Sequence, residues 1–158
     1  MTTNQPGREG GHPNSLGSHI LIREINFACR RERIFRPILV ADDDPFRAFG
    51  RCAALEEVFY GVVRVASAAE SFIKLDEPAF AASVALVIAG LNLPGMAGPA
   101  FVRELSRRIP QTPIVALGRQ GETAEDYPDK NVRFLPDQAS PADILNAATE
   151  MLSHARAA

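Results

Sequence analysis

The sequence predicts an α/β fold in which a five-stranded parallel sheet is covered by helices on both faces. From residue 37 onward, short apolar segments alternate with segments of helical periodicity. The apolar segments contain few polar residues, which is typical of strands buried on both faces of a parallel sheet. A chain of 158 residues suits a single domain of this kind with a terminal extension.

Five segments are predicted strands because β-branched and other apolar residues dominate each of them. In chain order they are PILVADDD (37–44), GVVRVAS (61–67), SVALVIAG (83–90), TPIVALG (112–118) and VRFLP (132–136). The connecting segments are long enough for helices. This alternation therefore predicts strand–helix–strand crossovers.

Four helices are predicted between and after these strands. The first covers 46–55, and the second, AAESFIKL (68–75), follows a capping box of Ser67 and Glu70. The third covers 98–108 and has a proline in its first turn, and the last begins at the N-cap Ser140. Between the fourth and fifth strands, RQGETAEDYPDKN (119–131) contains a glycine and a proline that leave little room for a helix.

The amino-terminal residues differ in composition from the rest of the chain. Residues 1–19 are rich in Gly, Pro, Asn, Ser and Thr, and we expect a disordered tail. Residues 20–36 have apolar positions at helical spacing and predict an amphipathic basic helix. Arg30, Arg31 and Arg33 at its end are candidates for a partner surface, and a solvated helix end is the alternative. The domain itself is predicted to cover 37–155.

Composition excludes several classes of protein. No apolar run is long enough to span a bilayer, and the amino terminus lacks the pattern of a secretory signal. Cys29 and Cys52 are far apart and suggest no disulfide framework, so we expect a cytoplasmic protein. The net charge is −2 and most acidic residues lie beyond residue 36, which argues against nucleic-acid binding by the domain.

The carboxyl ends of the predicted strands are the places to look for a site. Ligands of such folds bind beyond these ends. The residues there are Asp42, Asp43 and Asp44 after the first strand, Gly90 after the third, Gly118 after the fourth and Asp137 after the fifth. Acids and glycines therefore occupy the expected binding edge.

Four motifs at these ends, ILVADDDP, LNLPGMAG, TPIVAL and SPADIL, occur in order at fitting intervals. Together they resemble the receiver domain of two-component response regulators, over about residues 37–155. The resemblance implies a flavodoxin-like, doubly wound sheet ordered 2-1-3-4-5. The segment 119–131 is shorter than its counterpart in that family, so the fourth helix of the family is expected to be shortened or absent.

In the family, a carboxylate at the end of the third strand accepts a phosphoryl group beside a magnesium ion. The resemblance implies that Asp42 and Asp43 match the metal-binding pair, and that Asn92 matches the residue whose backbone carbonyl joins the coordination. These parts are present, although a bound magnesium ion is only weakly indicated and no other cofactor is expected.

Three further functional positions depart from the family pattern. Gly90 stands at the phosphoacceptor position, Gly118 at the hydroxyl position and Asp137 at the lysine position. No Asp or Glu lies between Pro78 and Glu104, so the phosphoacceptor is not displaced along the loop. Phe134 matches the switch aromatic, for which simple core packing is the preferred interpretation. We therefore expect no catalytic residue and no enzymatic activity.

Three carboxylates at one site repel one another unless a cation intervenes. One hypothesis is that Arg119 pairs with Asp42, Asp43 and Asp137 in place of the ion. A metal ion held by the three acids is one alternative, and an Asp137 that simply points to solvent is another.

These observations predict a stand-alone, phosphorylation-independent pseudo-receiver in two-component signalling. It would act by protein contact as an adaptor, a decoy or a subunit, with a histidine kinase or phosphotransfer protein as partner and a homodimer left open; neither nucleic acid nor membrane is expected. One alternative is a response regulator phosphorylated on Asp43 or Asp44. Another is a flavodoxin-like domain that binds a small molecule in space left by Gly90 and Gly118.

Overall fold

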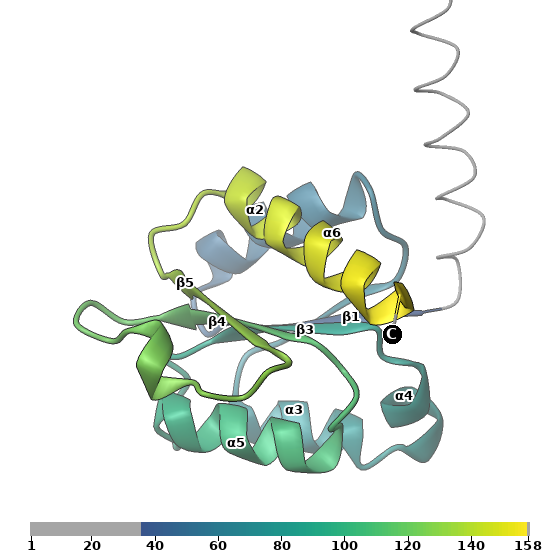
Figure 1. Cartoon of the computed structure of the whole chain (residues 1–158), viewed down its shortest axis with the longest axis horizontal. Coiled ribbons are helices and arrows are strands. Elements are labelled where there is room, and N and C mark those ends of the chain that lie inside the picture. Colours follow the sequence, from purple (N-terminus) through teal and green to yellow (C-terminus); the bar gives the residue numbers. More distant parts are fainter. Residues whose placement is uncertain (1–35, 158) are drawn as a thin grey trace, which may run out of the picture.

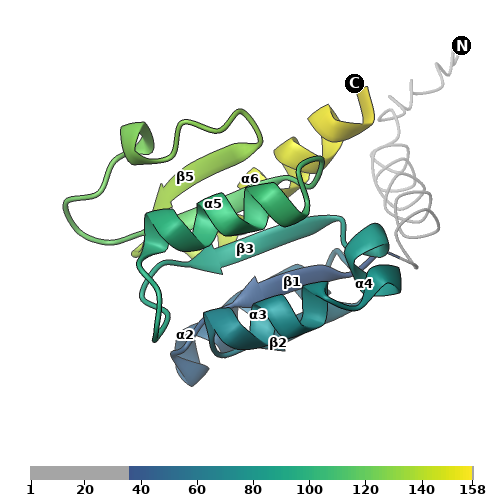
Figure 2. The ribbon, with the colours of Figure 1, turned by 90° about the horizontal axis from the view of Figure 1, so that it is seen from below.

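The sheet has five parallel strands in the order β2-β1-β3-β4-β5. The computed structural model describes residues 36–157. The strands are β1 (Ile38–Ala41), β2 (Val62–Val65), β3 (Leu86–Gly90), β4 (Ile114–Gly118) and β5 (Val132–Pro136). Every neighbouring pair is parallel, and β2 and β5 form the two edges (Figure 2). The predicted fold class and strand order are confirmed.

Helices cover both faces of this sheet (Figure 1). On one face lie α2 (Pro45–Glu56) and α6 (Pro141–Ala157), and on the other lie α3 (Ala68–Leu75), α4 (Pro78–Ser83) and α5 (Gly98–Arg108). The predicted caps are present, since Ser67 Oγ accepts from Glu70 N–H (3.1 Å) and Ser140 Oγ from Asp143 N–H (3.2 Å). Sequence patterns missed α4, because six residues are too few to show helical periodicity.

Each face of the sheet has its own hydrophobic core. Successive side chains of a strand point to opposite faces. Leu39 and Ala41 therefore join the core beneath α3 and α5, while Ile38 and Val40 join the core beneath α2 and α6. All residues of β1, β3 and β4 are buried, which explains why these segments are so apolar.

Between β4 and β5 the described chain forms only a single 3₁₀ turn, Ala124–Asp126. The prediction that a helix is shortened or absent between these two strands is confirmed. Thr123 caps this turn, and its backbone N–H donates to Asp126 Oδ2 (2.8 Å).

The predicted tail (1–19), and all of the predicted basic helix (20–36) except Arg36, lie outside the described residues. So do Arg30, Arg31 and Arg33, the candidate partner surface. Among the helices that are described, none combines the length and the apolar character that crossing a membrane requires.

Candidate functional site

The three aspartates after β1, Asp42, Asp43 and Asp44, have different roles. Asp42 is buried, with 1% of its surface exposed, whereas Asp43 is exposed. Asp44 is the N-cap of α2, and its Oδ1 accepts from the backbone N–H groups of Phe46 (2.9 Å) and Arg47 (3.0 Å). These bonds, that of Arg47 first, hold the pKa of Asp44 below its ordinary value. Asp44 is thus committed to starting the helix.

Two arginines of α2 neutralise the acidic site. Arg51 is buried, and its Nη1 pairs with Asp42 Oδ2. Its Nη2 donates to the backbone oxygen of Asp137 (3.0 Å) and to Asp137 Oδ1 (3.3 Å). Arg47, one helical turn earlier, donates from Nη1 to Asp137 Oδ2 (2.5 Å). Asp137 after β5 is thereby joined to α2 by both guanidinium groups.

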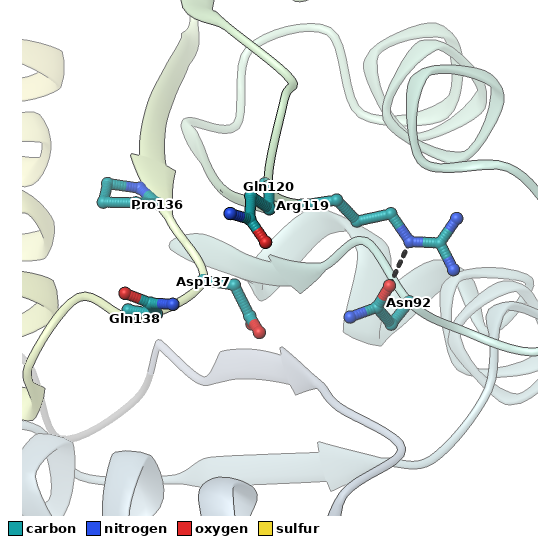
Figure 3. Close-up of a pocket in the computed structure, with 7 residues that line it drawn as sticks. Asn92, Arg119, Gln120, Pro136, Asp137 and Gln138 are labelled. Atoms are coloured by element: carbon teal, nitrogen blue, oxygen red, sulfur yellow. Dashed lines mark hydrogen bonds between the residues drawn. The ribbon is translucent and has the colours of Figure 1, made fainter.

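The hypothesis that Arg119 pairs with the acidic cluster is wrong. Arg119 Nε donates instead to the side-chain oxygen of Asn92, and Figure 3 shows the arginine directed away from Asp137. Arg119 follows β4 on the exposed side of the strand ends, whereas α2 lies directly beside β1. The alternative in which Asp137 points freely to solvent is also wrong, because both arginines of α2 hold its carboxylate.

Gly90 ends β3 at a place where a side chain does not fit. A Cβ atom built there would lie 2.8 Å from the backbone oxygen of Ala41 in β1. Ala41 pairs with Ala89 in the parallel ladder, so its backbone cannot move without disturbing the sheet. Any larger residue at position 90 therefore requires a shift of β1 or β3.

Gly118 ends β4 and is covered by the ring of Phe134. A Cβ atom at this position would lie 1.9 Å from Phe134 Cε2 and 2.3 Å from Cζ. The ring stacks on Tyr127, with 5.6 Å between centroids, and packs against the core beneath α3 and α5. Burial raises the pKa of Tyr127, whose hydroxyl donates to Glu122 (3.1 Å). The position that a Cβ atom would take at each of the two glycines is thus blocked, by Ala41 O at Gly90 and by the Phe134 ring at Gly118.

An open pocket of about 520 Å³ lies over the ends of β4 and β5 (Figure 3). Five of its seven lining residues have amide or charged side chains. Its lining residues are Asn92, Gly118, Arg119, Gln120, Pro136, Asp137 and Gln138. The pocket brings together Asn92, Gly118 and Asp137, three of the positions predicted from the sequence.

Comparison of the sequence with known protein families identifies the family of this chain. A family model of the response regulator receiver domain matches residues 38–134, which is more than half of the chain. The chain belongs to this family. The match spans β1 to most of β5 and so includes every strand that contributes to the site. A search of curated proteins gave no match to the sequence.

Solved receiver domains share the fold at low sequence identity. One is the signal receiver domain of an HD domain-containing protein from Pseudomonas fluorescens Pf-5, with 20% identity, TM-score 0.68, and coverage of 78% of this chain and 99% of that chain. Another is the chemotaxis response regulator CheY4 of Vibrio cholerae, with 20% identity, TM-score 0.61, and coverage of 74% and 98%. A receiver domain protein from Clostridium thermocellum gives 20% identity and TM-score 0.64, and covers 77% and 97%. Identities this low establish the shared fold alone.

The residues that the resemblance assigned to magnesium do not fit an ion in this receiver domain. Asp42 Oδ1 accepts from the backbone N–H of Asp44 (3.0 Å), and Asp42 Oδ2 is paired with Arg51. A hard divalent cation needs carboxylate oxygens that no other cation holds. Within residues 36–157, no group of three His, Cys, Asp or Glu side chains is arranged to hold a metal ion.

Sequence reasoning missed Arg47 and Arg51, although a signal was present. The two residues are four positions apart on the predicted first helix and so lie on one helix face. That helix begins directly after the run of three aspartates. Two cations facing the start of their own helix are close enough to pair with those acids.

Proposed function

We propose that this receiver domain works in two-component signalling without being phosphorylated, by direct contact with other proteins. The observation that carries the proposal is Gly90 at the phosphoacceptor position. The carboxylate is missing, and the 2.8 Å separation between a built Cβ and Ala41 O leaves no space for one. Without a nucleophile no aspartyl phosphate can form at this strand end.

Two further positions support the proposal. The position of the phosphate-contacting hydroxyl is Gly118, and Phe134 fills the space beside it. The position of the lysine is Asp137, whose carboxylate would repel a phosphoryl group. A domain that lacks the nucleophile, the hydroxyl and the lysine has lost the groups that act on the phosphoryl group, so we propose no catalytic activity.

Helix α2 offers a contact surface of fitting chemistry. Phe46 and Phe49 are 88% and 75% exposed, and their spacing of three places them on the same side of the helix. Exposed aromatic side chains gathered on one face are typical of protein-binding sites. We propose that a histidine kinase or phosphotransfer protein contacts this face. We place the function in the cytoplasm, in keeping with the free thiol of Cys52.

Mass spectrometry after incubation with a small phosphodonor and Mg²⁺ tests the proposal. We expect no gain of a phosphoryl group on the full chain. The variants Asp43→Asn and Asp44→Asn serve as controls for the two unconventional acids. If the wild-type chain gains a phosphoryl group that Asp43→Asn or Asp44→Asn loses, the domain is a phosphorylatable regulator and the proposal fails.

A second experiment tests the contact surface. The double variant Phe46→Ser/Phe49→Ser should keep the wild-type melting temperature, because both rings are exposed. It should lose binding to the cognate kinase or phosphotransfer protein in a direct titration. Ile73→Ser on α3, a similarly exposed apolar residue on the other face of the sheet, is the matched control and should bind as wild type. Equal binding by all three proteins would contradict the role of α2.

A further inference from the structure

We propose that Arg47 and Arg51 form a built-in cation for the acidic site, in place of a divalent metal ion. The inference rests on the proposed function and deepens it, because a site with its own cations needs neither metal nor phosphoryl group to keep its conformation. It concerns how the acids after β1 and β5 are neutralised and held.

Arg51 occupies the centre of this arrangement. Its side chain is 5% exposed and lies between Asp42, whose side chain is 2% exposed, and the loop after β5. One guanidinium nitrogen serves Asp42, and a second serves both the backbone and the side chain of Asp137. A planar group with several fixed donors can bridge two strand ends in this way.

Arg47 adds a second cation at the outer side of the cluster. Its Nη2 lies 3.7 Å from Asp42 Oδ1 and 3.6 Å from Asp43 Oδ1, and its Nε lies 3.4 Å from Asp44 Oδ2. With its bond to Asp137, this one guanidinium is within ion-pair distance of four carboxylates. Without this cation the neighbouring carboxylates would repel one another more strongly.

Both arginines belong to α2, so the pairing also fixes one element against another. Asp137 follows β5, which is three strands away from β1 in the sheet order, and Asp137 is separated from Arg47 by ninety positions in the chain. The ion pairs tie α2 to the β5–α6 connection. The exposed face with Phe46 and Phe49 is therefore held in one orientation without any bound ion.

Mn²⁺ binding to the full chain, measured by the relaxation of water protons, tests the inference. The wild-type chain should bind Mn²⁺ no better than a surface of scattered carboxylates. The variant Arg47→Ala/Arg51→Met leaves the same acids without their cations and should bind Mn²⁺ at least about tenfold more tightly than wild type. Arg133→Ala removes one positive charge, as Arg47→Ala alone does, from the exposed pair with Glu150, and is the control for the loss of a cation elsewhere on the surface, with no gain expected.

Circular dichroism establishes whether each variant is folded. If the double variant is not folded, Arg47→Ala alone carries the test, because it removes the partly exposed cation beside Asp43 Oδ1 and Asp137 Oδ2 while the buried Arg51 continues to support the fold. Saturable Mn²⁺ binding by the wild type would overturn the inference. So would folded variants that bind Mn²⁺ no better than Arg133→Ala.

The two proposals fail separately. Phosphoryl transfer to the wild-type chain refutes the proposed function and leaves the cation assignment standing. Saturable Mn²⁺ binding by the wild type without phosphoryl transfer refutes the cation assignment alone.

Discussion

The contact between Gly118 and Phe134 decides whether a larger residue at position 118 stabilises or destabilises the domain. Replacing a glycine within a strand by alanine ordinarily stabilises a protein by about 0.5–1 kcal/mol, because the unfolded chain loses freedom. At Gly118 the added Cβ would fall 1.9 Å from Phe134 Cε2, so the ring has to leave its place. We expect Gly118→Ala to be destabilising instead.

The magnitude follows from what the ring loses. Forcing an extra carbon into a filled site costs about 1–3 kcal/mol. Losing the stacked contact with Tyr127 (5.6 Å) adds about 0.5–1.5 kcal/mol. After subtracting the glycine gain, the net loss is about 2 kcal/mol, which lowers the melting temperature by about 8 °C for a domain of this size.

A double-mutant cycle measured by urea unfolding checks the physical cause. In a Phe134→Ala background the obstacle is gone, and Gly118→Ala should be neutral or stabilising, with a coupling energy of about 2 kcal/mol. Gly50→Ala in α2 is the matched control, since no heavy atom lies within 4 Å of its Cβ position, and it should be stabilising. A stabilising Gly118→Ala in the wild type, or a cycle that is additive, would refute the reasoning.

Three other changes test separate parts of the molecule. Gly90→Asp should lower the free energy of unfolding in urea by about 1–3 kcal/mol, because its Cβ meets the backbone oxygen of Ala41 at 2.8 Å, and wild-type stability would contradict this. The same variant should not gain a phosphoryl group from a small phosphodonor. Arg51→Met should lower the free energy of unfolding by about 3 kcal/mol or more, because it leaves the buried charge of Asp42 without a partner. Arg51→Met/Asp42→Leu should regain part of this stability, and a double variant less stable than Arg51→Met would oppose this account. Hydrogen bonds from Arg107 and Arg108 of α5 lower the pKa of Glu104 to about 2, below its ordinary 4.5, so the ionised carboxylate contributes its full stability above pH 4.5 and loses it as the pH falls toward 2. In thermal melts between these two pH values, the melting temperature of Glu104→Gln should fall less than that of the wild type. Parallel curves for the two proteins would exclude the effect.

Local patterns in the sequence were sufficient for most of the fold. All five strands, and every described helix except α4, lie where apolar runs and caps predicted them. Interior strands such as β3 are buried on both faces and so must be apolar throughout, which leaves a strong signal. The short α4 left none, since its six residues bury no side chain completely.

The acids and glycines of the candidate site were predicted, whereas the two arginines that pair with the acids were not. Asp42, Gly90, Gly118 and Asp137 could be found because each follows a strand, and strand ends meet at one edge of a parallel sheet. Arg119 also follows a strand, but its side chain lies on Asn92. Which cation reaches an acid depends on side-chain direction, and adjacency in sequence does not give that direction.

Residue identity and periodicity by themselves determined the alternation of strands and helices and the residues at the strand ends. The resemblance of four motifs to receiver domains implied the strand order, the family, and the functional groups missing at Gly90, Gly118 and Asp137. Only the tertiary structure decided that Arg47 and Arg51 neutralise the acids, and that Ala41 and Phe134 close the space beside the two glycines. These contacts join segments as far apart as α2 and the end of β5. Distances between such segments are set by the packing of the sheet and its helices, which no local pattern records.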